Sequence, residues 1–267
     1  MKRKLTSSIL VLLFLAFGPN NALSVTKVEA QDLGPAALVD TGNVFFLQSD
    51  FEAADEAYAS ALAVDTNYAP AYAHRCYLRT YQDQYEEAIA DCERAVELAP
   101  DGPEGFIYLT RAFDWNKEFE KAVEAGKQAV FLAPESGLAQ SFLGEAYIDL
   151  DEWEAGERAI RLGVELAPNE PEVHRNMAYL HDELGDTDAS LAEMKKAIDL
   201  APRFTPHYRQ IARYYFWNDQ YELTLDYFQQ MQAIAQEVGN RRPFLFMMRR
   251  IRGRGATGAT IINIISD

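Results

Sequence analysis

One tripeptide recurs through this sequence at a constant interval. The proline of each Leu-Ala-Pro copy is Pro100, Pro134, Pro168 or Pro202, so successive copies are 34 positions apart with no insertion or deletion between them. A constant period of roughly 20 to 50 residues is typical of stacked supersecondary units, because each unit buries its apolar face only against its neighbours. The period therefore predicts a repeat array, and function is expected on the surface of the stack.

Blocks of this period divide most of the chain into six units, each with the pattern of two antiparallel helices. The units span 35–68, 69–102, 103–136, 137–170, 171–204 and 205–238. Small residues recur at matched places in both halves of a unit, such as Gly42 and Ala54 in the first. Bulky apolar residues recur at spacings of three, four and seven, which indicates amphipathic helices rather than strands. Turn residues such as Asp83 separate the two helices.

The fourth unit carries the most complete residue pattern. Its pattern consists of Leu143, Gly144, Tyr147, Trp153 and Pro168. The second and third units match at most of the same positions, and the first and sixth lack the closing proline, as terminal repeats often do. The units therefore resemble tetratricopeptide repeats. The resemblance implies an all-α fold, a right-handed α-solenoid of antiparallel helix pairs, and a protein or peptide partner in its concave groove.

The N-terminal segment 1–30 differs in character from the array, which we place at residues 31–240. Three basic residues precede an uninterrupted apolar run from Ile9 to Phe17, which is too short to span a bilayer as a helix. A basic start, a short apolar middle and small residues before Gln31 are typical of a cleaved signal peptide. We therefore predict a secreted or periplasmic protein; an uncleaved membrane anchor is the alternative.

The C-terminal segment is basic. In residues 241–252 the apolar side chains Phe244, Met247, Met248 and Ile251 fall on one helical face, with arginines beside them. Two interpretations stay open for this amphipathic helix: it covers the apolar side of the last repeat, or it lies on an anionic membrane. The glycine-rich residues 253–267 are predicted to be a flexible tail, and a truncated or altered reading frame is also compatible with them.

The charge of the array argues against one class of partner. Residues 31–240 carry 15 basic and 39 acidic residues, a net charge of −24. Such a surface repels phosphate backbones, so we expect no nucleic acid as a partner. The acidic surface serves solubility in the first place, with basic partners as a secondary possibility.

No motif of a catalytic, metal or cofactor site is present in the sequence. It contains no HExxH, no CxxC, no glycine-rich phosphate loop and no nucleophile-elbow serine. His174 and His181 fall in positions where other units carry core aromatic residues, so packing is the favoured interpretation of both. We therefore predict a protein that is not an enzyme and that has no metal and no cofactor.

The two cysteines lie in one unit, one on each predicted helix. Cys76 and Cys92 are at about the same level on either side of the turn. An exported protein permits a disulfide here, which would contribute about 3 kcal/mol to stability in the chain-entropy description. The alternative, that both are buried thiols packed as small apolar residues, stays open.

The residues of the groove are predicted from the first helix of each unit, on the face opposite its small-residue position. They are Asn43, Phe46, Tyr77, Tyr81, Arg111, Trp115, Arg175, Tyr179, Arg209, Arg213, Phe216 and Trp217. Aromatic residues and arginines dominate interface energies. Arg175, Arg209 and Arg213 fall in adjacent units, so we predict that they hold an acidic or C-terminal peptide together with Trp217. The alternative is that these arginines neutralise neighbouring acids such as Glu172 and Asp182.

Three classes of function follow from these predictions. The first is an exported scaffold that binds a protein or peptide in its concave groove. The second is a structural component of an envelope complex that uses the convex face or the ends of the array. A third and weaker class is an accessory to an enzyme on another chain. A groove rich in accessible aromatic residues and arginines favours the first class.

Overall fold

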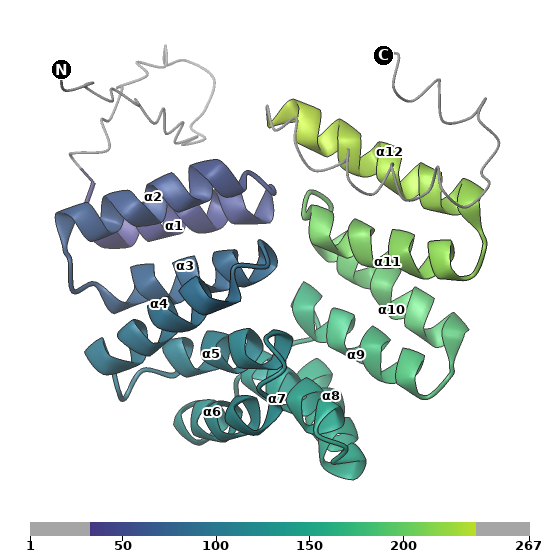
Figure 1. The fold of residues 1–267 in the computed structure, drawn as a ribbon, viewed down its shortest axis with the longest axis horizontal. Coiled ribbons are helices and arrows are strands. Elements are labelled where there is room, and N and C mark those ends of the chain that lie inside the picture. Colours follow the sequence, from purple (N-terminus) through teal and green to yellow (C-terminus); the bar gives the residue numbers. More distant parts are fainter. Residues whose placement is uncertain (1–32, 239–267) are drawn as a thin grey trace, which may run out of the picture.

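The computed structural model describes residues 33–238, and every regular element within this range is a helix (Figure 1). The predicted signal peptide 1–30, the basic helix 241–252 and the tail 253–267 lie outside the described residues. The first helices of the six units are α1 (Pro35–Leu47), α3 (Ala69–Tyr81), α5 (Pro103–Trp115), α7 (Gly137–Asp149), α9 (Pro171–Glu183) and α11 (Thr205–Trp217). The second helices are α2 (Phe51–Val64), α4 (Tyr85–Leu98), α6 (Phe119–Leu132), α8 (Trp153–Leu166), α10 (Thr187–Leu200) and α12 (Tyr221–Glu237).

Helix ends follow from local residue chemistry. Proline stands at the first or second position of α1, α3, α5, α9 and α11, where its missing amide hydrogen costs nothing. Before α2 the side chain of Asp50 accepts a hydrogen bond from the amide of Ala53 (3.2 Å), and Asp186 caps α10 in the same way. The Leu-Ala-Pro endings lie where the second helices end, at Leu98, Leu132 and Leu166 among others.

The turn between the two helices of a unit has the same backbone conformation in all six units. One residue per turn has a positive φ, between 58° and 76°. These residues are 34 positions apart: Ser49, Asp83, Lys117, Asp151, Gly185 and Asp219. Five of the six are not glycine, so the repeat geometry imposes a left-handed conformation that these side chains tolerate at a small energetic cost.

Small residues allow the helices of a unit to touch. The fourth unit is an example, since a Cβ atom on Gly144 of α7 would lie 2.6 Å from the side chain of Ile160 and 2.9 Å from the backbone oxygen of Gly156 on α8. The corresponding positions in the other units, such as Cys76 and Ala88, are fully buried. The sequence prediction that these positions mark helix contacts is confirmed.

The stacked pairs form a right-handed superhelix that curves back on itself. In Figure 1 the pairs follow a curved path from α1–α2 to α11–α12. The turn after α1 reaches the loop before α11, where the amide of Thr205 donates a hydrogen bond to Ser49 Oγ (2.7 Å). Beside it the rings of Phe46 and Phe204 lie 5.0 Å apart. The first unit thus contacts the start of the sixth, which the sequence did not predict.

Candidate functional site

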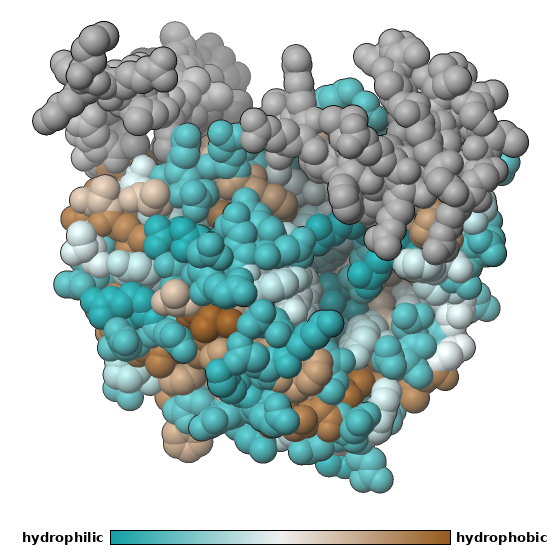
Figure 2. Space-filling model, in the orientation of Figure 1, coloured by the Kyte–Doolittle hydropathy of each residue, from teal (hydrophilic) through white to brown (hydrophobic). Residues whose placement is uncertain are grey.

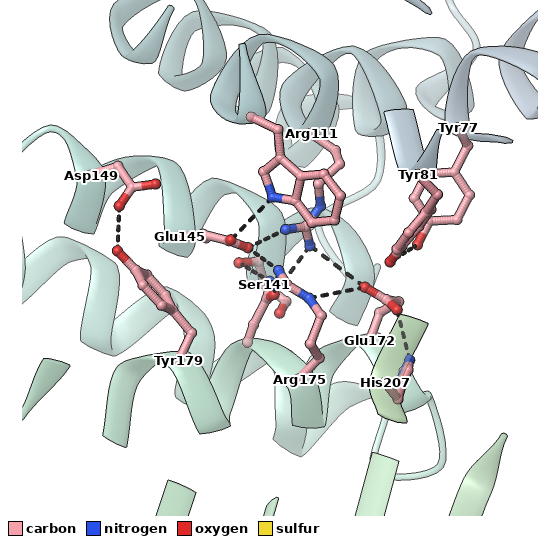
Figure 3. Close-up of polar contacts among 12 residues, drawn as sticks. Tyr77, Tyr81, Arg111, Ser141, Glu145, Asp149, Glu172, Arg175, Tyr179 and His207 are labelled. Atoms are coloured by element: carbon pink, nitrogen blue, oxygen red, sulfur yellow. Dashed lines mark hydrogen bonds and ion pairs between the residues drawn. The ribbon is translucent and has the colours of Figure 1, made fainter. Parts of the chain in front are cut away.

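The centre of the superhelix is occupied by two arginines and two glutamates, here called the inner network. Arg111 of α5 and Arg175 of α9 both donate hydrogen bonds to Oε2 of Glu145 on α7. Nε of Arg175 also donates to Glu172 (3.2 Å), and Nη2 of Arg111 lies 3.8 Å from the same carboxylate oxygen. Figure 3 shows the two carboxylates on either side of the two guanidinium groups.

Aromatic and amide groups complete the inner network. The guanidinium carbon of Arg111 lies 3.8 Å from the ring centre of Phe142 and 5.0 Å from that of Trp115. Arg175 lies 5.4 Å from the same tryptophan ring. Asn176 accepts a hydrogen bond from Arg111 (3.1 Å) and donates one to the backbone oxygen of Ser141 (2.8 Å). The charges are therefore buried among aromatic rings that favour cations.

Burial and charge act against each other in this network. Burial alone would raise the pKa of Glu145, but Arg111 and Arg175 outweigh it and lower the pKa. Burial would lower the pKa of Arg175, and the carboxylates of Glu145 and Glu172 raise it. His207, whose Nε2 lies 3.0 Å from Oε1 of Glu172, is fully buried, and its pKa is lowered to about 4 by that burial. His207 is therefore neutral in the folded protein near pH 7.

An aromatic cluster fills the superhelix on the N-terminal side of the network. Tyr77 stacks on Tyr108 with 4.4 Å between ring centres, and Tyr81 packs edge-on against Trp115 (5.2 Å) and Phe204 (5.1 Å). Burial raises the pKa of Tyr77 and of Tyr81 well above the ordinary value. This part of the inner face is consequently a packed core and not an open groove.

A cleft of about 550 Å³, here called the central cleft, opens next to the inner network. Its lining residues come from the first helices, the turns and the starts of two second helices in the second to the sixth units. They are Tyr81, Asp83, Tyr85, Asp114, Trp115, Lys117, Phe119, Glu145, Asp149, Arg175, Tyr179, Pro206, His207, Arg209, Gln210 and Arg213. This volume is in the range of clefts that hold small molecules or one or two peptide residues.

A second cleft of about 610 Å³, the α9–α11 cleft, shares Tyr179, Gln210 and Arg213 with the central cleft. It is lined by α9, α10 and α11 and extends to Trp217, whose side chain is 57 % exposed. Within residues 33–238 neither Arg209 nor Arg213 forms an ion pair, and Arg213 is exposed. The two clefts together make a continuous set of accessible residues along α11.

The comparisons with known proteins agree with this geometry. The family model of the tetratricopeptide repeat matches residues 69–101 and 172–204. These segments lie in the second and fifth of six helix pairs that repeat at a constant interval. The chain contains tetratricopeptide repeats. No curated protein is significantly similar to it in sequence.

A solved tetratricopeptide repeat structure shares the fold. TTC0263, a tetratricopeptide repeat protein of Thermus thermophilus, superposes with a TM-score of 0.57 at 19 % identity, over 67 % of this chain and 98 % of that one. MamA of Desulfovibrio magneticus RS-1 has a TM-score of 0.44 at 17 % identity, over 62 % and 94 % of the two chains. At 19 % identity the likeness to TTC0263 concerns the fold alone. Tetratricopeptide repeat arrays are typically non-enzymatic scaffolds for protein–protein interaction.

The predicted groove residues of this chain divide into two groups. A buried group has little access to a ligand and corrects the prediction of a groove open along its whole length: Phe46, Tyr77, Tyr81, Arg111 and Arg175. The reason is that the superhelix closes on itself and its inner face becomes core. Arg175 pairs with Glu172, as the alternative interpretation held, and also with Glu145. Asn43 accepts a hydrogen bond from the hydroxyl of Tyr58 (2.8 Å) and thus joins two helices.

The other group lies along the clefts. Trp115, Tyr179, Arg209 and Arg213 line the central cleft, and Trp217 lines the α9–α11 cleft. Phe216 packs against Tyr221 with 5.9 Å between ring centres. The predicted convergence of Arg175, Arg209 and Arg213 is therefore partial, because all three line one cleft but Arg175 is bound by glutamates.

The sequence prediction missed the acidic residues of the site. Glu145 accepts from both buried arginines, and Asp114 and Asp149 have carboxylate oxygens within 4.8 Å of it and of each other. These three are the residues that have the ligand chemistry for a metal ion. One signal was available, since Arg111 and Glu145 occupy the same place in adjacent units, where opposite charges come together when units stack.

The structure resolves the two interpretations of the cysteines in favour of a disulfide. The Sγ atoms of Cys76 and Cys92 lie 2.04 Å apart, which is a covalent bond, and the Cα atoms lie 5.4 Å apart. It joins α3 to α4. Both residues are fully buried, so the bond lies within the packed interface of the two helices.

Two further observations concern the hydropathy of the surface and of the helices. Figure 2 shows a largely hydrophilic face with apolar residues in small, separate patches. Among residues 33–238, none of the helices combines the length and the hydropathy that crossing a bilayer requires.

Proposed function

We propose that this scaffold binds a carboxylate-bearing segment of a partner protein, either an acidic peptide or a C-terminus, along α11. The observation that supports the proposal is the pair Arg209 and Arg213, which lie one helical turn apart and have no ion-pair partner within residues 33–238. The array has a net charge of −24. Two arginines without acidic partners in one cleft wall are therefore a local positive site that favours a negatively charged ligand. Their guanidinium forks match carboxylate geometry.

The surrounding residues suit a peptide chain. Tyr179 and Trp217 present ring surface in the α9–α11 cleft, and Gln210 offers an amide that can donate to and accept from a peptide backbone. Arg175 contributes differently from the sequence prediction. Because it is held by Glu145 and Glu172, it shapes the wall of the central cleft and is not a primary ligand contact.

We also propose that the protein functions outside the cytoplasm. The support comes from the signal-like sequence of residues 1–30 and from the Cys76–Cys92 disulfide. Disulfides persist in oxidising compartments and are rare in the cytoplasm.

The binding proposal is tested with an array of peptides that end in a free carboxylate or carry acidic runs, compared with amidated and neutralised versions. Affinity of the selected peptide is then measured by fluorescence anisotropy for the wild type and for the double variant Arg209→Ala, Arg213→Ala. We expect a loss of at least about tenfold, since each charged hydrogen bond contributes about 1.5–3 kcal/mol.

A matched control is available on α8. Within residues 33–238, Arg158 and Arg161 pair only with the exposed side chains of Glu154 and Glu157 of the same helix. The double variant Arg158→Ala, Arg161→Ala removes the same charge and should leave binding unchanged. Equal losses in both double variants would mean that the arginines act only through net charge. Unchanged binding in the α11 variant would end the proposal and favour the convex face or the ends as the binding surface.

The export proposal has its own measurement. The N-terminal sequence and the mass of the protein recovered from an extracellular or periplasmic fraction are determined, and thiols are labelled after unfolding without reductant. A chain that begins at Gln31 and takes up no label supports the proposal. An intact Met1 in a cytoplasmic fraction with two labelled cysteines contradicts it.

A further inference from the structure

Three carboxylates meet at the base of the central cleft. Asp114 lies near the end of α5, and Glu145 and Asp149 lie one turn apart on α7. One carboxylate oxygen of each lies within 4.8 Å of those of the other two. All three residues line the cleft, so the cluster is reached from solvent on one side and is backed by protein on the other.

Asp114 has unused binding capacity. Asp114 is almost fully buried, with 3 % of its surface exposed. Its buried Oδ1 has no hydrogen-bond partner within residues 33–238. A buried carboxylate oxygen without a donor is energetically costly. Glu145 also retains capacity, because its Oε1 receives only a long hydrogen bond from Trp115 Nε1 (3.4 Å).

The side chains around the cluster have a formal net charge of −2. Around the cluster stand four carboxylates, those of Asp114, Glu145, Asp149 and Glu172. They face two guanidinium groups, of Arg111 and Arg175. The other cations of the cleft wall, Lys117, Arg209 and Arg213, form no ion pair with these four acids. Direct contacts therefore leave two negative charges without a counterion. Buried carboxylates without a counterion lower their energy by taking up protons or by binding a cation.

We propose that Asp114, Glu145 and Asp149 bind one divalent cation, and that this cation is calcium. The donors are all hard oxygens, which calcium and magnesium prefer over softer metals. Calcium accepts oxygens at about 2.3–2.6 Å in flexible geometry, whereas magnesium requires a near-ideal octahedron at about 2.0–2.1 Å. Calcium therefore suits better three carboxylates whose positions are fixed by the packing of α5 against α7. The open side of the cleft leaves room for water to complete the six to eight ligands. Tyr179 positions Asp149 through its hydrogen bond.

The test uses the full chain stripped of metal with a chelator and titrated with CaCl₂ alone at neutral pH. Isothermal calorimetry should show one saturable site. Terbium, which replaces calcium, should give luminescence when the aromatic residues of the cleft are excited, and CaCl₂ should displace it. These two measurements need no variant, and they do not involve the peptide, so their failure is distinct from failure of the proposed function.

Two variants locate the site. Asp149→Asn and Asp114→Asn keep the side-chain shape and should weaken calcium binding by at least about tenfold, because a direct ligand matters at least as much as the outer partners of a metal site. Asp83→Asn is the matched control, since Asp83 lines the same cleft, lies outside the cluster and has a positive φ that asparagine tolerates. Circular dichroism confirms the helical fold of each variant.

Three results would overturn the proposal. The first is the absence of saturable heat and of displaceable terbium luminescence in the wild type. The second is equal calcium affinity in the wild type and in folded Asp149→Asn. The third is a loss of affinity in Asp83→Asn as large as in Asp149→Asn. If the first result came with a carboxyl proton of Asp114 that titrates above its ordinary range, the two aspartates share a proton instead of binding a cation.

Discussion

The same repeat positions have opposite environments at the two ends of this array. Tyr81 of α3 and Trp217 of α11 occupy equivalent places, four units apart, yet Tyr81 is 3 % exposed and Trp217 is 57 % exposed. Tyr77 and Arg213 form a second equivalent pair, of which the first is buried and the second exposed. Position within a repeat therefore fixes the direction of a side chain but not whether it is accessible.

The difference arises from what lies across the superhelix. The inner face of α3 is covered by the loop before α11, whose Phe204 packs against Tyr81 and Phe46. The inner face of α11 lines the two clefts. One end of the inner face has become core and the other has remained a surface. Substitutions in both regions can test this contrast.

The largest effect is expected in the inner network. Glu145→Ala removes the carboxylate that both Arg111 and Arg175 bind and leaves two buried cations without it. Loss of one partner of a buried ion pair costs about 3–5 kcal/mol in the free energy of unfolding. Urea denaturation measures it. The control Glu157→Ala breaks an exposed pair with Arg161 and should cost at most about 0.5 kcal/mol; similar losses in both variants would contradict a buried network.

The second target is the contact between the loop before α11 and the first two units. Phe204→Ala removes the ring that touches Phe46, Tyr81 and His207, so we expect a loss of about 3 kcal/mol. Phe131 is 77 % exposed, and Phe131→Ala should change stability by at most about 0.5 kcal/mol. Hydrogen exchange should also become faster in α1 of the Phe204 variant. Unaltered exchange in α1 would show that the first unit does not depend on this contact.

The buried histidine predicts a dependence on pH. His207 has a pKa of about 4 in the folded protein and 6.5 as its ordinary value, so the unfolded chain binds more protons between these pH values. The stability from neutral His207 is thus complete above pH 6.5 and is lost as pH falls toward 4, by at most about 3 kcal/mol. The advantage of the wild type over His207→Asn in urea denaturation should shrink across this range. Parallel profiles of stability against pH for the wild type and His207→Asn would exclude His207 as the cause of this pH dependence.

The smallest effect on stability is expected on the open face. Arg209→Ala and Arg213→Ala break no ion pair within residues 33–238, so each should change the free energy of unfolding by at most about 0.5 kcal/mol. Thermal or urea denaturation is sufficient to measure this. A loss above about 1.5 kcal/mol in either variant, well beyond the range of surface substitutions, would place that arginine in the core and remove the contrast between the two ends.

The candidate site was predictable only in part. The aromatic and arginine residues on the inner face are visible in the sequence because they occupy fixed places in the period. Their partners are visible only in part: Arg111 and Glu145 occupy the same place in adjacent units, but Arg175 meets Glu145 from a different place in the next unit. The carboxylates of Asp114 and Asp149 come together from different places in adjacent units, and a single sequence gives no rule for such diagonal pairs.

The sequence by itself determined the repeat, the two helices of each unit, the small residues at their contacts and the turns, because all of these depend on interactions within one unit or with its neighbour. The repeat period specifies them locally. Only the tertiary structure decided that Ser49 meets Thr205, that the inner face closes beside α3 and stays open beside α11, and that Arg175 is bound while Arg213 is accessible. Superhelical curvature is the sum of small rotations between units, and these rotations depend on packing that no single residue pattern encodes.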